Sequence, residues 1–106
     1  MDESAMLKAI LETPYPLFEQ QRNAVTSEER YVRIVAGAGA GKTETLTRRI
    51  AYLLLCKEEQ PTSIVAFTFT DRAAQSMKNR VYQRVAQFKG EEACARLGEM
   101  YIGTIH

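Results

Sequence analysis

The chain has 106 residues, of which 45% are hydrophobic and 25% are charged, and its formal net charge at pH 7 is +1. These values are typical of globular material of at most one domain, and they exclude a disordered chain or one that attracts nucleic acid by bulk charge. The longest apolar run, around residues 50–56, is too short to span a bilayer, and no charged-then-apolar leader precedes it. We therefore expect a cytoplasmic protein without membrane contact.

The two cysteines, Cys56 and Cys94, match no metal-ligand spacing. A chain with so few cysteines is typical of a reducing compartment, where thiols stay free. We therefore expect two free thiols.

Two helices are expected before the first strand. Residues 1–12 mix polar and apolar side chains, and Pro14 and Pro16 stop the helix that they predict. Residues 17–25 are expected to form a second, short helix that turns Phe18 and Val25 toward the core.

A glycine-rich loop follows, between a strand expected at residues 31–36 and a helix expected at residues 44–56. The loop ends in Gly41-Lys42-Thr43, and this strand–loop–helix setting is typical of a site for a nucleoside triphosphate. Glycines let successive backbone N–H groups point at phosphate oxygens, and the following helix presents its positive end to them. The phosphate-binding loop comprises Ala36, Gly37, Ala38, Gly39, Ala40, Gly41, Lys42 and Thr43.

Within this loop, Lys42 is expected to reach the outer phosphates and Thr43 to place its hydroxyl on a magnesium ion. These two residues are the expected catalytic residues, and Thr43 is the expected metal ligand. ATP and Mg²⁺ are the expected cofactors. Ala36 stands where the strict pattern has glycine, a small change that the strand end should tolerate. The alternatives are an incidental glycine-rich turn and an unrelated ATP- or GTP-dependent kinase or switch.

The rest of the chain alternates helices and strands. The helix after the loop should pack on a sheet, residues 63–69 should form a parallel strand buried on both faces, and residues 100–103 should start a third strand. Asp71 is expected to cap the helix between the last two strands, and Gly90 to end it. The apolar positions of the two helices are Leu46, Ile50, Leu53 and Leu54 in the first, and Ala74, Met77, Val81, Val85 and Phe88 in the second.

An acidic residue on a later strand normally helps to hold the magnesium ion of a phosphate-loop domain. Glu44 and Asp71 are the acids nearest the expected strand ends, but neither follows an apolar strand as such an acid does. The expected fold is therefore an α/β, partial P-loop domain, with a parallel sheet flanked by helices and truncated after about three strands.

Four ordered segments, at residues 17–25, 36–43, 68–74 and 103–106, resemble the first motifs of UvrD/Rep-type superfamily 1 DNA helicases. The resemblance implies a RecA-like fold. It divides the chain into an N-terminal helical extension at 1–16 and the N-terminal part of a helicase ATP-binding domain at 17–106.

The resemblance also assigns roles. Gln21 would read the adenine edge, and Glu44 stands in the nucleotide site where relatives often carry an arginine that lies against adenine. Phe69 would stack on a base of single-stranded DNA, although its place at a strand end also fits a core residue. Arg72 replaces the usual lysine as a cation for phosphate. The implied DNA-binding residues are Thr68, Phe69, Thr70, Arg72, Gly103, Thr104 and His106.

A further basic face, formed by Lys78, Arg80 and Arg84, is expected to be solvated or to lie toward DNA. The resemblance implies an ATP-dependent helicase that translocates 3′ to 5′ on single-stranded DNA. The chain alone should be inactive, because it lacks the metal-holding acid, the arginine finger and a second motor domain. It should self-associate through open sheet edges. Two alternatives remain open. The chain could belong to the helicase subunit of a helicase–nuclease, or it could be a non-catalytic nucleotide- or DNA-binding remnant.

Overall fold

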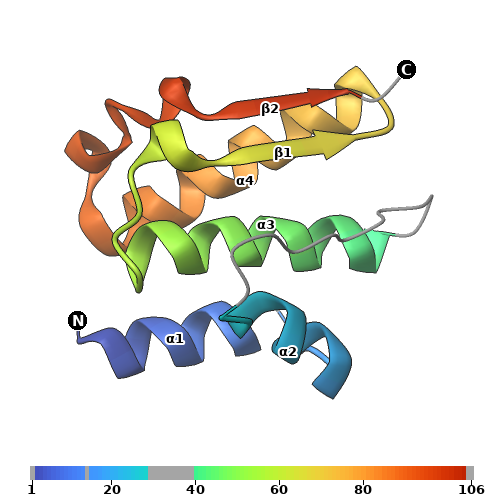
Figure 1. The fold of residues 1–106 in the computed structure, drawn as a ribbon. Coiled ribbons are helices and arrows are strands. Elements are labelled where there is room, and N and C mark those ends of the chain that lie inside the picture. The colour runs from blue at the N-terminus through green and yellow to red at the C-terminus, as the bar shows by residue number, and fades with distance from the viewer. Residues whose placement is uncertain (1, 14, 29–39, 105–106) are drawn as a thin grey trace.

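A computed structural model describes residues 2–13, 15–28 and 40–104 of the chain, with the backbone alone at 40–42. A small two-stranded sheet lies at one side of a stack of helices (Figure 1). The helices are α1 (Glu3–Glu12), α2 (Glu19–Thr26), α3 (Ala40–Leu55) and α4 (Asp71–Lys89), the strands are β1 (Val65–Thr68) and β2 (Tyr101–Thr104), and three 3-10 turns lie at Pro61–Ser63, Glu91–Cys94 and Leu97–Glu99.

The two strands run parallel, and α4 is the crossover that joins them. Val65 pairs with Tyr101 at one end of the register, and Thr68 pairs with Thr104 at the other. Parallel neighbours need such a crossover, usually a helix. The expected α/β class and the parallel pairing are therefore confirmed. The first expected strand, at residues 31–36, lies outside the described residues.

The prediction that the strand after α3 is buried on both faces is wrong. Ala66 and Thr68 are buried, whereas Val65 and Phe67 are 62% and 45% exposed. The Phe67 ring meets that of Tyr101 edge to face, with centroids 5.6 Å apart, on the same open side. The physical reason is that α4 covers one face of the pair, and no described element covers the other.

Helix α3 forms the middle layer, between α4 on one side and α1 and α2 on the other (Figure 1). Ile50, Ala51 and Leu55 are buried there, while the expected core residues Leu46, Leu53 and Leu54 are partly buried. Among the described elements, the main neighbours of α3 are helices, and the strand expected at residues 31–36 lies outside the described residues.

Helix α1 begins at Glu3, two residues after the expected start, because Asp2 is its N-cap and the Asp2 side chain accepts a hydrogen bond of 2.7 Å from the backbone N–H of Ala5. In α2, Val25 is fully buried as predicted, but Phe18 is 82% exposed. Phe18 is the N-cap, with extended backbone at φ −68° and ψ 160°, so helical spacing does not carry its side chain to the Val25 face.

Thr70, rather than Asp71, caps α4. The Thr70 hydroxyl accepts a 3.0 Å hydrogen bond from the N–H of Ala73, and Asp71 is the first residue of the helix. Both residue types are good caps, so sequence alone does not choose between neighbours. Gly90 ends the helix at φ +82°, as predicted. The core positions of α4 are also confirmed, with Ala74, Met77, Val81 and Val85 buried and Phe88 packed against them.

Both cysteines are free thiols, as expected, and Cys56 is buried at the end of α3. Burial, followed by the charge of Glu3, raises the pKa of the Cys56 thiol above its ordinary value of 9.0. The unfolded chain therefore releases this proton at a lower pH than the folded chain. The stability that Cys56 contributes is complete below the pKa of the unfolded thiol and is lost as the pH rises through the folded value.

We expect the urea midpoint of unfolding to fall between pH 8 and pH 10, and Cys56→Ala to make this fall shallower. Cys94→Ala is the matched control, because Cys94 is less buried. If the urea midpoint falls equally steeply with pH in the wild type and in Cys56→Ala, the thiol does not contribute to the loss of stability at alkaline pH.

Candidate nucleotide and nucleic-acid site

The phosphate-binding loop leads into α3. This helix begins at Ala40, four residues before the expected start, so the end of the loop sequence forms the first helical turn. First-turn N–H groups have no acceptor within their own helix, and they favour an anion. Thr43 is partly buried, and its carbonyl accepts a 2.9 Å hydrogen bond from the Thr47 hydroxyl. Of the expected site residues, Ala36, Gly37, Ala38, Gly39 and His106 lie outside the described residues, and so do the side chains of Ala40 and Lys42.

Gln21 lies in the first turn of α2. Its side-chain oxygen accepts a 2.9 Å hydrogen bond from the backbone N–H of Phe18. This contact fixes the plane of the amide at the start of the helix. An amide group both donates and accepts, so its orientation decides which atoms of a ligand it recognises.

Glu44, directly after Thr43, is the centre of an ion-pair cluster. Its carboxylate lies 2.8 Å from Arg48 Nε, 3.1 Å from Arg80 Nη1 and 3.7 Å from Arg84 Nη2. The Glu44 side chain is only 10% exposed. The arrangement joins one carboxylate of α3 to cations of both α3 and α4.

The arginines of the cluster also hold α1. Arg48, which is fully buried, donates from Nη1 to the carbonyls of Leu11 (3.1 Å) and Tyr15 (2.8 Å), and its guanidinium lies 4.7 Å from the centroid of the Tyr15 ring. Arg84 donates to the carbonyls of Ala9 and Thr13. The last carbonyls of a helix have no partner within it, and α1 has no basic residue in its own last turn. Arginines from two other helices add donors to these carbonyls, of which Ala9 and Leu11 also accept from the backbone N–H groups of Thr13 and Leu17.

The expectation that Arg84 belongs to a solvated or DNA-facing surface is wrong, because its side chain is 11% exposed and bonded to α1. Burial and then the charge of Arg48 lower the pKa of Arg84, while Glu44 opposes this shift. Arg80 keeps 43% exposure and lies at the edge of the cluster. The i,i+4 spacing of Glu44 and Arg48 was the sequence signal that could have revealed the pair.

The strand ends bring two of the expected DNA-contact segments together. Thr68 pairs with Thr104 across the sheet, and the Thr104 hydroxyl donates a 2.9 Å hydrogen bond to the carboxylate of Asp71. In α/β folds the carboxyl ends of parallel strands are the usual ligand-binding edge. The segments at residues 68–72 and 103–104 therefore share one edge.

At this edge Phe69 is 54% exposed, so the alternative that it is a core residue is wrong. Thr68 is buried, and its hydroxyl donates to the carbonyl of Thr70 at 2.9 Å. The hydroxyls of Thr68 and Thr70 thus shape the turn, and the Phe69 ring between them faces outward.

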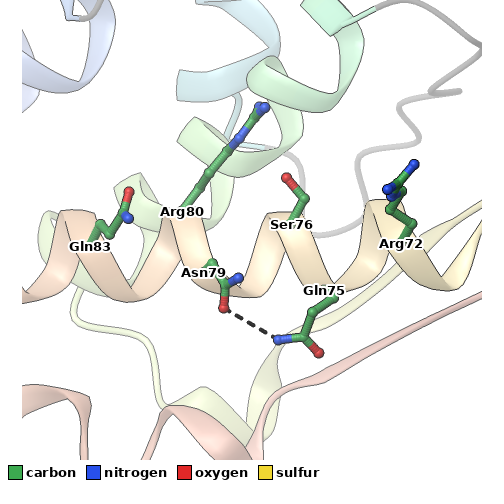
Figure 2. Close-up of a pocket in the computed structure, with 6 residues that line it drawn as sticks. All are labelled: Arg72, Gln75, Ser76, Asn79, Arg80 and Gln83. Carbon is green, nitrogen blue, oxygen red and sulfur yellow. Dashed lines mark hydrogen bonds between the residues drawn. The ribbon is translucent and has the colours of Figure 1, made fainter.

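An open polar groove runs along α4 beside this edge (Figure 2). Two cations and no acid line it, and Arg80 extends from it toward α3. Gln75 and Asn79 are joined by a hydrogen bond of 3.3 Å. The lining residues are Arg72, Gln75, Ser76, Asn79, Arg80 and Gln83.

The described residues contain no group of three acidic, histidine or cysteine side chains that could hold a metal ion. Glu44 is engaged by arginines, and Asp71 accepts from Thr104. None of the described helices is long and apolar enough to cross a bilayer.

Fold and site together define an α/β segment in which parallel strands end side by side and a phosphate-loop sequence runs into a helix. The chain belongs to the UvrD/REP helicase family, because the sequence model of the UvrD/REP helicase N-terminal domain matches residues 17–106.

Three relatives illustrate the likeness. DNA helicase II of Salmonella typhimurium is 39% identical over 90 residues, which are 85% of this chain and 11% of that protein. The ATP-dependent DNA helicase UvrD1 of Mycobacterium leprae is 42% identical over 87 residues, 82% of this chain and 10% of that protein. The ATP-dependent DNA helicase PcrA of Staphylococcus epidermidis is 51% identical over 74 residues, which are 70% of this chain and 10% of that protein. The chain thus spans about a tenth of the length of these relatives.

Proposed function

We propose that this chain is the front part of a RecA-like, P-loop motor domain, within an ATP-dependent DNA helicase. The observation that carries the proposal is the family match over residues 17–106, which contains the phosphate-loop sequence and all four ordered motifs. Relatives that match the chain are named ATP-dependent DNA helicases, which supports the use of ATP and DNA.

In this proposal the loop at residues 36–41 binds the phosphates through its backbone, Lys42 binds the outer phosphates, and Thr43 holds Mg²⁺. The start of α3 at Ala40 fits that role, because first-turn N–H groups then face the end of the loop. A bound magnesium ion neutralises charge that develops on the phosphates. Gln21 selects adenine with an amide whose plane is set by Phe18.

Single-stranded DNA would bind at the carboxyl edge of the strands. The exposed ring of Phe69 offers a stacking surface, and stacking is worth about 1–3 kcal/mol per base without regard to sequence. Arg72 supplies a cation for the phosphate backbone from the first turn of α4. Because the Thr68 and Thr70 hydroxyls are used in the turn, we assign them the positioning of Phe69, with Gly103, Thr104 and His106 completing the contact.

The intact polypeptide would couple hydrolysis to 3′–5′ translocation in the cytoplasm, either alone or as the helicase subunit of a helicase–nuclease. The chain by itself is proposed to be inactive in hydrolysis. Its open sheet face, with Val65, Phe67 and Tyr101, supports self-association of the isolated piece.

The test is ATP hydrolysis by the full polypeptide that carries this sequence, measured with and without single-stranded DNA. We expect DNA to stimulate hydrolysis, and a duplex with a 3′ single-stranded tail to be unwound. The 106-residue chain should show no turnover in the same assay. A full polypeptide that binds ATP and DNA without turnover would leave the binding-remnant alternative, and one that binds neither would refute the proposal.

A further inference from the structure

Glu44 links the two longest helices of the chain. It follows Thr43 directly, and its carboxylate pairs with Arg80 and Arg84 of α4 as well as with Arg48 of its own helix. Within residues 2–13, 15–28 and 40–104, no other acidic side chain forms an ion pair with α4. The start of α3 is therefore linked to α4 through this carboxylate, in addition to the packing between the two helices.

The other end of α4 is fixed to the strand ends. Thr70 caps the helix, and Asp71 in its first turn accepts the hydrogen bond of Thr104 at the end of β2. Arg80 lies nine positions after Asp71, which is about 14 Å along a helix. A continuous α-helix of 19 residues thus joins the Glu44 cluster to the edge that carries Phe69 and Arg72.

We propose that Glu44 is a positioning residue that couples the phosphate loop to the DNA-contact edge, with α4 as the rigid connection. This inference rests on the proposed function. Both oxygens of the carboxylate accept hydrogen bonds from arginines, so we assign Glu44 a role in positioning rather than in direct contact with either ligand.

The two arginines of α4 that pair with Glu44 have different roles. Arg84 is buried and bound to the carbonyls of α1, so it anchors the helix. Arg80 is half exposed and bound to Glu44 through one nitrogen at 3.1 Å, so this contact can form and break without unfolding the core. The Glu44–Arg80 pair is therefore the adjustable contact between the two sites.

The experiment measures the dissociation constant for single-stranded DNA in the full polypeptide, with and without a non-hydrolysable ATP analogue. The ratio of the two constants is the coupling factor, which is commonly about fivefold or more between linked sites. We expect Arg80→Gln to bring this factor close to one, while the affinity for each ligand alone changes less than about threefold, as the exposure of Arg80 suggests. Arg80→Lys keeps the charge and should retain at least half of the coupling.

Two further variants sharpen the test. Glu99→Gln removes an exposed partner of Arg96 at 3.0 Å and should leave the coupling factor unchanged. Glu44→Gln should lower the coupling as Arg80→Gln does, and the double variant should lose no more than either single one, because both break the same contact.

The inference is overturned if the wild type binds both ligands without coupling, or if Arg80→Gln keeps the full coupling factor. Should Glu44→Gln fail to fold, the Arg80 variants decide the question alone. Loss of binding to both ligands in the wild type would instead refute the proposed function, so the two failures are distinguishable.

Discussion

Replacing Lys42 with alanine is expected to lower DNA-stimulated ATP hydrolysis of the full polypeptide by about two orders of magnitude or more. The lysine stands at the end of the phosphate-binding loop, in the first turn of α3, where its charge would meet the outer phosphates. Loss of one preorganised cation or donor at a developing charge commonly costs about 10²–10³-fold in rate. The measurement is the turnover number at saturating DNA, together with the affinity for a fluorescent ATP analogue.

The matched control is Lys57→Ala. Lys57 is an exposed lysine just beyond the end of α3, where it pairs with Glu28 at 3.5 Å. Its removal should leave turnover within about twofold, because an exposed ion pair contributes little. Near-normal turnover in Lys42→Ala would exclude this loop as the site of hydrolysis. Equal losses in both variants would point to a general effect of charge.

Replacing Arg48 with alanine is expected to destabilise the chain by about 3–5 kcal/mol, the usual cost of breaking a buried ion pair. The change leaves the Glu44 carboxylate without its 2.8 Å partner and removes the donor shared by the carbonyls of Leu11 and Tyr15. Both losses fall in the interior, where Arg48 has no exposed surface. Urea unfolding monitored by circular dichroism measures the change.

Two variants separate charge from packing in this experiment. Arg48→Met keeps an unbranched apolar stem. The difference in the free energy of unfolding between Arg48→Met and Arg48→Ala therefore measures the contribution of packing by this stem. Arg72→Ala removes an exposed arginine of α4 and should change the stability by less than about 0.5 kcal/mol. An Arg48→Ala variant as stable as the wild type would show that the cluster does not hold the helices together.

The elements with strong local patterns could be predicted from the sequence. Hydrophobic periodicity predicts the buried stripe of α4 and the parallel strands on either side of it. The glycine at position 90 predicts where this helix ends. The motif order also sufficed to recognise the family, which the match over residues 17–106 confirms.

Burial that depends on distant parts of the chain could not be predicted in the same way. The apolar run at residues 63–69 has the composition of a fully buried strand, yet Val65 and Phe67 face outward because α4 covers one side only. Composition reports how suitable a strand is for burial, and tertiary neighbours decide whether burial occurs. The prediction that Phe18 faces the core is wrong for a related reason. Phe18 is the N-cap and has extended backbone, so helical spacing does not give the direction of its side chain.

The arginine cluster was missed because its ion pairs and carbonyl contacts span long distances in sequence. Arg84 bonds to residues more than 70 positions earlier, and Arg80 bonds to Glu44 across 36 positions. Charged residues are mostly exposed, so a surface was the reasonable expectation for Arg84. Only the packing of α1 against α3, with α4 beyond it, reveals that its charge lies inside.

The attachment of α1 has a consequence for where this domain physically starts. Sequence similarity begins at residue 17, but the carbonyls of Ala9, Leu11 and Tyr15 receive guanidinium groups that belong to the interior of the similar region. A protein trimmed to the similar residues would lose these carbonyl acceptors and the packing of α1 against α3, and the guanidinium groups of Arg48 and Arg84 would be exposed to water. The cooperative folding unit therefore extends upstream of the homology boundary. Helix α1 thus forms an outer layer of the domain that the similarity covers.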